Sequence, residues 1–138
     1  MTRKLLFAEM PGSGSEKSFA TCLNCIDGRT HLPLIDWIKT HYGVQFVDLI
    51  TEPAMIELLA CGFQDNTLLL GKIRISLEKH SSKVIIAAGH HDCAGCSKSN
   101  LDHKKDLDNA VANLSQLFPE VQVCGVWINE NWTVERVI

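Results

Sequence analysis

Short apolar runs alternate with longer amphipathic stretches along this chain. The most strand-like run covers residues 83–88, in which every residue after Lys83 is apolar. A run that is apolar on both faces is typical of a strand in the middle of a parallel sheet covered by helices. Further apolar runs predict the other strands, which cover residues 18–26, 44–50, 121–128 and 132–138.

Apolar residues at helical spacing predict helices between these strands. Thr30 is placed to cap the first helix, with Pro33 in its first turn. Strands that alternate with helices predict an α/β fold, with a mostly parallel central sheet of about four strands flanked by helices. The second helix is predicted over residues 54–61 and the third over 66–80, and the apolar face of the fourth carries Leu107, Val111, Leu114 and Phe118.

Length and composition narrow the class of protein. The 138 residues suffice for one core, with a predicted flexible lead-in over residues 1–17 and a single domain over residues 18–138. A net charge of −3 gives no attraction to nucleic acid or to an anionic membrane. No apolar run approaches the roughly 20 residues that span a bilayer, and residues 2–10 make a poor signal peptide. We therefore expect a cytoplasmic protein without nucleic-acid or membrane partners.

The six cysteines need an explanation other than disulfides, because the cytoplasm is reducing. Cys61 and Cys124 lie among apolar residues and are predicted to be small buried side chains. The other four form two Cys-x-x-Cys pairs, Cys22 with Cys25 and Cys93 with Cys96.

Two motifs follow the ends of predicted strands. Cys-Ile-Asp-Gly-Arg occupies residues 25–29, and Gly-His-His-Asp-Cys-Ala-Gly-Cys occupies residues 89–96. In parallel sheets, ligands bind outside the carboxyl ends of the strands. If the two strands are neighbours, about 5 Å apart, Cys25 can face His90 and Cys93 across a gap that fits a zinc ion. Thiolate and imidazole donors favour zinc over magnesium or calcium, and three protein ligands leave a fourth position open, as in catalytic sites.

Strand geometry argues against a site built from all four paired cysteines. Cys22 and Cys25 would lie roughly 10 Å apart on opposite faces of one strand, so Cys22 is predicted to be a core residue. Cys96 remains a candidate fourth ligand, because a helix beginning near Cys93 would place it on the same face one turn later.

Together the two motifs resemble the zinc signature of the β-class carbonic anhydrases. That signature has Cys-x-Asp-x-Arg after a first strand and Gly-His-x-x-Cys after a central strand, and the likeness covers roughly residues 18–128, including the helix at 75–78 before the central strand. The resemblance implies that zinc is held by Cys25, His90 and Cys93, with an Asp27–Arg29 pair beside it.

The activity implied by this resemblance is reversible hydration of carbon dioxide to bicarbonate by zinc-bound hydroxide. Zinc lowers the pKa of bound water from about 15.7 towards roughly 7. Asp27 would orient the hydroxide, and Arg29 would hold Asp27 ionised in a forked pair. In the family, an aspartate released by the arginine can itself take the fourth zinc position. His91 is a candidate proton relay, and family members are homodimers or higher homo-oligomers.

Departures from the family pattern keep two alternatives open. The chain is short and lacks the long N-terminal helical arm; residues 51–54 read Thr-Glu-Pro-Ala instead of a polar, asparagine-containing stretch, and Ala94-Gly95 replaces the usual glycine pair. The same site is a candidate for carbonyl sulfide or carbon disulfide. It is also a candidate for a non-catalytic zinc-binding or sensing protein, closed by Cys96 or Asp27. A thiol redox protein is the weakest alternative.

The remaining histidines and tryptophans are assigned structural roles. The tryptophans are predicted to be core or subunit-contact residues, and they are Trp37, Trp127 and Trp132. The histidines outside the second motif are predicted to be surface residues at helix ends, and they are His31, His41, His80 and His103.

Overall fold

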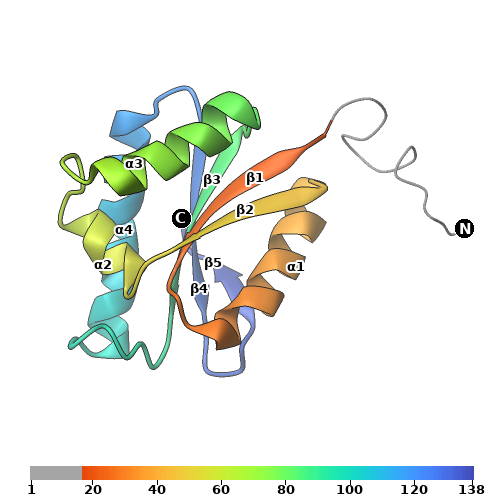
Figure 1. Ribbon diagram of the computed structural model, residues 1–138. Helices are drawn as coiled ribbons and strands as arrows, with labels where there is room; N and C mark the ends of the chain where they lie inside the picture. The colour runs from red at the N-terminus through yellow and green to blue at the C-terminus, as the bar shows by residue number, and fades with distance from the viewer. Residues whose placement is uncertain (1–16) are drawn as a thin grey trace, which may run out of the picture.

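The computed structural model describes residues 17–138. All of the predicted lead-in except Lys17 therefore lies outside the described residues. No helix in this part of the chain is long and apolar enough to cross a membrane. Strands and helices alternate (Figure 1) in the order β1 (Phe19–Asn24), η2 (Gly28–Thr30, 3₁₀), α1 (His31–Tyr42), β2 (Phe46–Thr51), α2 (Met55–Ala60), α3 (Thr67–Arg74), η3 (Ile75–Lys79, π-helical), β3 (Val84–His90), α4 (Asn100–Leu117), β4 (Gln122–Ile128) and β5 (Val134–Arg136).

The five strands form one sheet in the order β2-β1-β3-β4-β5. The first four are parallel, and β5 pairs with β4 in the antiparallel direction. The predicted α/β fold with a mostly parallel sheet is therefore confirmed. The apolar residues 84–88 of the predicted run lie in β3, which is buried at every position and lies at the centre of the sheet, as its composition predicts.

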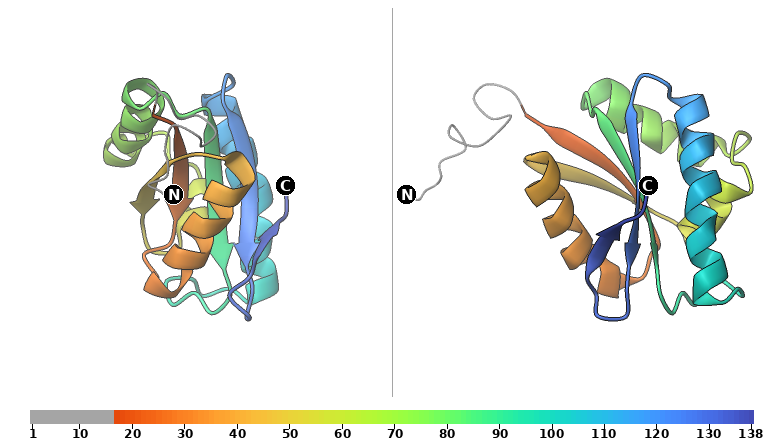
Figure 2. Two further views of the ribbon diagram at one scale, coloured as in Figure 1. Left: turned by 90° about the vertical axis from the view of Figure 1, so that its right-hand side faces the viewer. Right: turned by 180° about the vertical axis from the view of Figure 1, so that it is seen from behind.

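Helices cover both faces of the sheet (Figures 1 and 2). Helix α1 lies on one face, and α2, α3 and α4 lie on the other. Because successive side chains of a strand point to opposite faces, Cys22 packs into the core with Leu34 and Ile38 of α1, whereas Leu23 packs into the core on the opposite face. Cys22 is thus a core residue, as strand geometry predicts.

Two helix ends are marked by residues suited to them, whereas the cap predicted at Thr30 does not form its side-chain bond. Helix α1 ends at Gly43, which has a φ of 65°, and Asn66 caps α3 by accepting a hydrogen bond from the Leu69 backbone N–H. The third helix extends over nearly the whole predicted range, but its last turn is π-helical. Thr30 occupies the N-cap of α1 without making a side-chain cap bond, because its hydroxyl donates to the Asp27 carbonyl, 2.7 Å away.

Two predictions of burial were wrong. Cys61 is exposed, because α2 ends at Ala60 and Cys61 is already its C-cap. His103 is only 2% exposed instead of lying at the surface. Helix α4 begins at Asn100, so His103 lies one turn before the core residue Leu107 and on the same face, with its ring edge-on to Trp127.

A substitution at Gly89 tests how tightly the core packs around the end of β3. A Cβ atom at Gly89 would overlap Ile56 Cδ1 and lie 3.1 Å from Trp127 Cζ3. We expect Gly89→Ala to lower the free energy of unfolding in urea by about 1–3 kcal/mol through overpacking. Adding Ile56→Val, which removes the Cδ1 atom, should cost less than the sum of the two single changes.

The matched control for this change is Gly71→Ala in α3, where an added Cβ meets no atom within 4 Å. The same chemical change should stabilise the protein there by about 0.5–1 kcal/mol, because alanine favours the helix. Equal effects at the two glycines would contradict the close packing around β3.

Candidate metal centre

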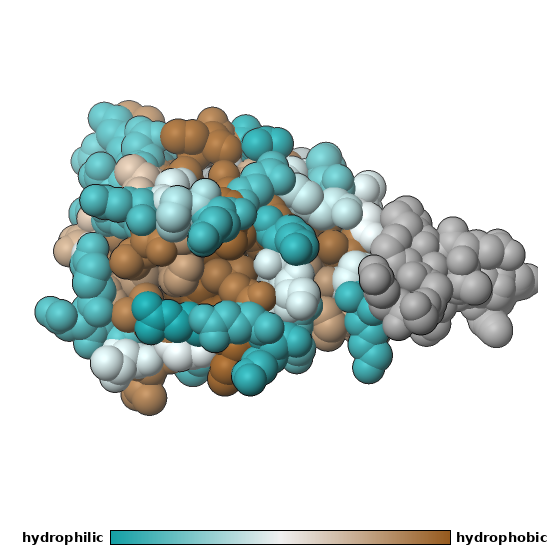
Figure 3. All heavy atoms as spheres, turned by 90° about the horizontal axis from the view of Figure 1, so that it is seen from above, coloured by the Kyte–Doolittle hydropathy of each residue, from teal (hydrophilic) through white to brown (hydrophobic). Residues whose placement is uncertain are grey.

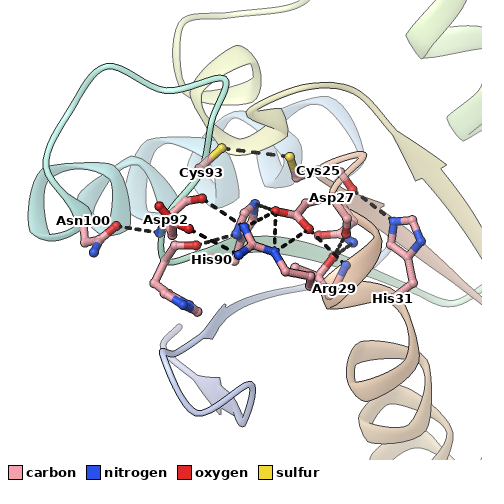
Figure 4. Close-up of polar contacts among 11 residues, drawn as sticks. Cys25, Asp27, Arg29, His31, His90, Asp92, Cys93 and Asn100 are labelled. Carbon is pink, nitrogen blue, oxygen red and sulfur yellow. Dashed lines mark hydrogen bonds and ion pairs between the residues drawn. The ribbon is translucent and has the colours of Figure 1, made fainter.

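Three potential metal ligands meet at the carboxyl ends of β1 and β3, which are adjacent strands. Cys25 follows β1, His90 is the last residue of β3, and Cys93 lies in the following loop. Their ligand atoms all lie within 4.8 Å of one another. The sulfur atoms of Cys25 and Cys93 are 3.9 Å apart (Figure 4). The predicted approach of the two motifs is therefore seen in the structure.

The side chain of His90 is fully buried, and the backbone of the next residue orients its ring. Its Nδ1 donates a hydrogen bond to the His91 carbonyl oxygen, 2.6 Å away, which is the kind of contact that metal-bound histidines make through their second nitrogen. Nε2 has no hydrogen-bond partner in residues 17–138. A buried polar atom left without a partner is uncommon, and here it faces two thiols that could share a metal ion with it.

The two thiols of the cluster differ in acidity. Burial opposes ionisation of Cys25, but interaction with the His90 ring and with backbone N–H groups of Asp27 and Ala54 outweighs it and lowers the Cys25 pKa to about 7. Burial raises the pKa of Cys93 to about 11, and the nearby Cys25 sulfur adds to the rise. In the metal-free protein, Cys25 is therefore the first of the two thiols to ionise. Its negative charge then disfavours ionisation of Cys93.

This donor set fits a zinc ion. Two sulfurs and one imidazole nitrogen are the soft ligands that zinc prefers, and three of them leave a fourth position free. Cys25, His90 and Cys93 form the only group of three or more mutually close potential ligands in the described part of the chain.

Asp27 lies beside the cluster but faces Arg29. Arg29 Nη2 donates to Asp27 Oδ2 at 2.6 Å, Arg29 Nε donates to Oδ1 at 3.0 Å, and the Arg29 backbone N–H donates to Oδ1 at 3.0 Å. These bonds lower the pKa of Asp27 to about 2. Asp27 Oδ2 is also 4.0 Å from His90 Nε2. The carboxylate is thus ionised and adjacent to the candidate metal position.

Buried side chains fix the turn that carries Asp27. Asn24 Nδ2 donates to Thr30 Oγ1 at 2.8 Å, and Thr30 Oγ1 donates to the Asp27 carbonyl. Both Asn24 and Thr30 are fully buried. The motif that follows β1 is therefore held by hydrogen bonds from the end of the strand itself.

Two contacts of Arg29 were not predicted. Arg29 Nη1 lies 3.2 Å from Asp92 Oδ2, and the guanidinium carbon lies 4.7 Å from the centre of the Trp132 ring. Asp92 was part of the second motif without an assigned role, and Trp132 was expected in the core or at a subunit contact. Nothing in the local sequence indicates either contact, because residues 92 and 132 are distant from Arg29 in the chain. They come close to it only because β1, β3 and β4 lie side by side in the sheet.

Residues 53–54 pack against the loop after His90. A Cβ atom at Gly95 would lie 3.3 Å from both the Ala54 nitrogen and Pro53 Cβ. Ala54 has a φ of 50°, and its backbone N–H contributes to the low pKa of Cys25. Residues 51–54 and the loop after His90 therefore form a single wall beside the thiols.

Cys96 and His91 lie next to the cluster of three ligands. No helix begins near Cys93, since α4 starts at Asn100, and the Cys96 sulfur lies 3.8 Å from Glu57 Oε2. His91 packs its ring against Trp132, with 4.4 Å between ring centres, and its Nδ1 is buried without a hydrogen-bond partner in residues 17–138. The roles expected for Cys96 as a ligand and for His91 as a relay remain predictions.

A polar network that was not predicted joins α2, the loop after β3 and α4. Lys98 Nζ lies 3.5 Å from Glu57 Oε2 and 2.8 Å from Asp106 Oδ1. Asp106 Oδ2 in turn lies 3.1 Å from His103 Nδ1. Burial lowers the pKa of His103 despite this carboxylate. The network ties the loop that carries Cys93 to the two helices beneath it.

Comparison with known proteins identifies the family and the fold. A family model described as "Putative carbonic anhydrase" matches residues 15–138. No curated protein matches the chain. The fold is similar to that of the β-carbonic anhydrase CafA of Aspergillus fumigatus, with a TM-score of 0.61 and 13% identity over 90% of this chain and 76% of the other.

Two further solved structures share the fold. A mutant of the β-carbonic anhydrase CafD of Aspergillus fumigatus has a TM-score of 0.61 and 11% identity, covering 97% of each chain. One of two tetrameric β-carbonic anhydrases of Sordaria macrospora has a TM-score of 0.52 and 16% identity, covering 96% of this chain and 85% of the other. At these identities, the likeness shows a common fold.

The difference in acidity between the two thiols is testable by alkylation of metal-free protein with iodoacetamide. Since the thiolate is the nucleophile, the rate at Cys25 should reach half its maximum near pH 7, and Cys93 should require pH values near 11. Peptide mass spectrometry separates the sites, with exposed Cys61 as an internal reference.

His90→Ala removes an interaction that favours the Cys25 thiolate, so the midpoint for Cys25 should then rise toward 9.0. An unchanged midpoint in this variant, or identical midpoints for Cys25 and Cys93 in the unmodified protein, would contradict the assigned electrostatics.

Proposed function

The chain belongs to the carbonic anhydrase family matched above, and on that premise we propose that it is a zinc lyase that interconverts carbon dioxide and bicarbonate. One observation carries the proposal: the buried Nε2 of His90, without a hydrogen-bond partner in residues 17–138, lies among two thiols and beside an ionised carboxylate. Cys25, His90 and Cys93 would hold the zinc ion. When bound, zinc supplies the Lewis acidity that makes water a nucleophile near neutral pH.

Asp27 is proposed to orient the reacting water. With its pKa lowered to about 2, the carboxylate is ionised at any physiological pH and accepts hydrogen bonds only. A water that donates to Asp27 has its remaining lone pair directed away from the carboxylate and toward carbon dioxide. Arg29 keeps Asp27 ionised and holds it by the forked pair.

His91 is proposed to carry the released proton outward. Its Nδ1 is buried without a hydrogen-bond partner in residues 17–138, it adjoins His90 in the chain, and an imidazole can accept a proton on one ring nitrogen and donate one from the other. The fourth position of the metal is proposed to be left to water, because Asp27 is paired with Arg29 and the Cys96 thiol faces Glu57. A cytoplasmic location remains a prediction.

The proposal predicts one zinc ion per purified chain and acceleration of carbon dioxide hydration in a stopped-flow pH-indicator assay. Cys25→Ser and Cys93→Ser should lose both zinc and activity. Asp27→Asn should keep the zinc but lower kcat/KM by about 10–100-fold, because a side chain that orients the reacting group is altered while the ligands remain. Cys61→Ser, at an exposed cysteine outside the cluster, is the matched control and should keep both.

Two outcomes would redirect the proposal. Zinc without any hydration from about pH 7 to about pH 9 would reject the activity and favour a non-catalytic zinc protein. Hydrogen sulfide released from carbonyl sulfide, without hydration of carbon dioxide, would identify the other substrate class.

We also propose that the protein is a homodimer or a larger homo-oligomer. The outer edge of β2 has no strand partner among the described residues, and an open groove of about 360 Å³ runs along it, lined in part by Leu49, Ile50 and Ile75. Free strand edges favour pairing with another chain. Figure 3 shows one face of the molecule, on which apolar surface lies between rows of polar side chains.

Light scattering after size exclusion should therefore give at least twice the chain mass of 15.3 kDa. Ile75→Glu should reduce that mass, because Ile75 lines the groove and is 57% exposed. Leu68→Glu is the matched control, at a residue that is 78% exposed and does not line the groove. A monomer in the unmodified protein would contradict this assignment.

A further inference from the structure

We propose that Asp92 and Trp132 are positioning residues that hold Arg29 and, through it, keep Asp27 away from the fourth metal position. The inference rests on the proposed function, because it assigns a purpose to residues around the same site. Figure 4 shows Asp27 and Asp92 on either side of the Arg29 guanidinium.

The two edges of the guanidinium are taken by two carboxylates. Arg29 Nε and Nη2 donate to Asp27. Arg29 Nη1 donates to Asp92 Oδ2 at 3.2 Å, and Nη2 also donates to the Asp92 carbonyl at 3.3 Å. A guanidinium presents its donors in a rigid plane, so contacts on both edges fix its rotation within that plane.

The face of the guanidinium is covered by Trp132. The Arg29 Cζ atom lies 4.7 Å from the centre of this ring, within the range of a cation–π contact. The indole is supported in turn by His91, with 4.4 Å between ring centres. Edge and face contacts together prevent the side chain from swinging into solvent, although 48% of it is exposed.

Asp92 and Trp132 make these contacts from backbone conformations with positive φ. Their φ angles are 56° and 60°, and non-glycine residues seldom adopt such values. The Asp92 backbone N–H is held by Asn100 Oδ1 at 2.9 Å, and the Trp132 N–H donates to the Asn129 carbonyl at 2.9 Å. Unfavourable backbone geometry of this kind persists where the surroundings impose it, often at functional sites.

Release of Arg29 would change the metal site directly. Asp27 Oδ2 is already 4.0 Å from His90 Nε2, so a small rotation brings the carboxylate to the position next to the three ligands. An Asp27 that is no longer paired would bind another cation, and a metal ion held by Cys25, His90 and Cys93 would lie beside it. Asp92 and Trp132 thus decide whether Asp27 or an outside molecule takes the fourth position.

The first test needs no metal. In the metal-free protein, the Arg29 Nε–H proton should give a slowly exchanging NMR signal, assigned by its loss in Arg29→Lys. Trp132→Leu removes the aromatic face and should speed exchange by about tenfold, while Trp132→Phe retains a ring and should stay near the original rate. Asp92→Asn, which tolerates the positive φ, should also speed exchange.

The second test uses cobalt(II)-loaded protein and thiocyanate as a probe of an open position. Thiocyanate should change the visible cobalt bands of the unmodified protein. In Trp132→Leu its binding should weaken by about tenfold, and Trp132→Phe should preserve it. Adding Asp27→Asn to Trp132→Leu should restore the binding, because the competing carboxylate is gone. If Trp132 had only a structural role, adding Asp27→Asn would not restore thiocyanate binding.

The outcomes separate the two proposals. If the protein binds no cobalt or zinc, the proposed function fails, and the exchange test still judges the contacts of Arg29. If cobalt binds but thiocyanate binding is equal in all variants, the positioning role is overturned and the metal site stands. Persistent weak binding after Asp27→Asn is added would likewise overturn it.

Discussion

The buried imidazole of His90 is the group on which this end of the molecule depends. It ends the central strand, its Nδ1 is committed to the His91 carbonyl, and its Nε2 has no partner in residues 17–138. An unpaired polar atom in the interior costs free energy. The sulfurs of Cys25 and Cys93 beside it complete a donor set that zinc would satisfy. The close packing of Gly89 against Ile56 and Trp127 keeps this imidazole in place.

Charge balance determines what can stand beside that donor set. Two thiolates neutralise a dication, so a third anion nearby needs a cation of its own. Arg29 provides that cation to Asp27 and pairs with Asp92 through its other edge. Because Trp132 covers its face, loops that follow β1, β3 and β4 all meet at one guanidinium. The electrostatics of the site therefore depend on three separate segments of the chain.

Much of the fold was predictable because local patterns carried it. The uninterrupted apolar run of β3 indicated a central strand, and β3 lies at the centre of the sheet. The burial of the first turns of α4 was harder to predict, because polar side chains point inward there. His103 and Asp106 are buried and form a hydrogen bond with each other. The prediction that Cys61 is buried was wrong for the opposite reason. Its apolar neighbours suggested burial, but the end of α2 lies at the surface.

The sequence by itself identified the residues that meet at the candidate site, on the condition that β1 and β3 are neighbours, which the sheet order then showed. Motifs at the carboxyl ends of parallel strands come together whenever those strands are neighbours, so Cys25, His90 and Cys93 could be placed before any coordinates. Tertiary structure alone decided how Arg29, the partner of Asp27, is itself held. The contacts of Arg29 with Asp92 and Trp132 join residues that are distant in the chain, and the turns that present them adopt positive φ values that side-chain patterns do not encode.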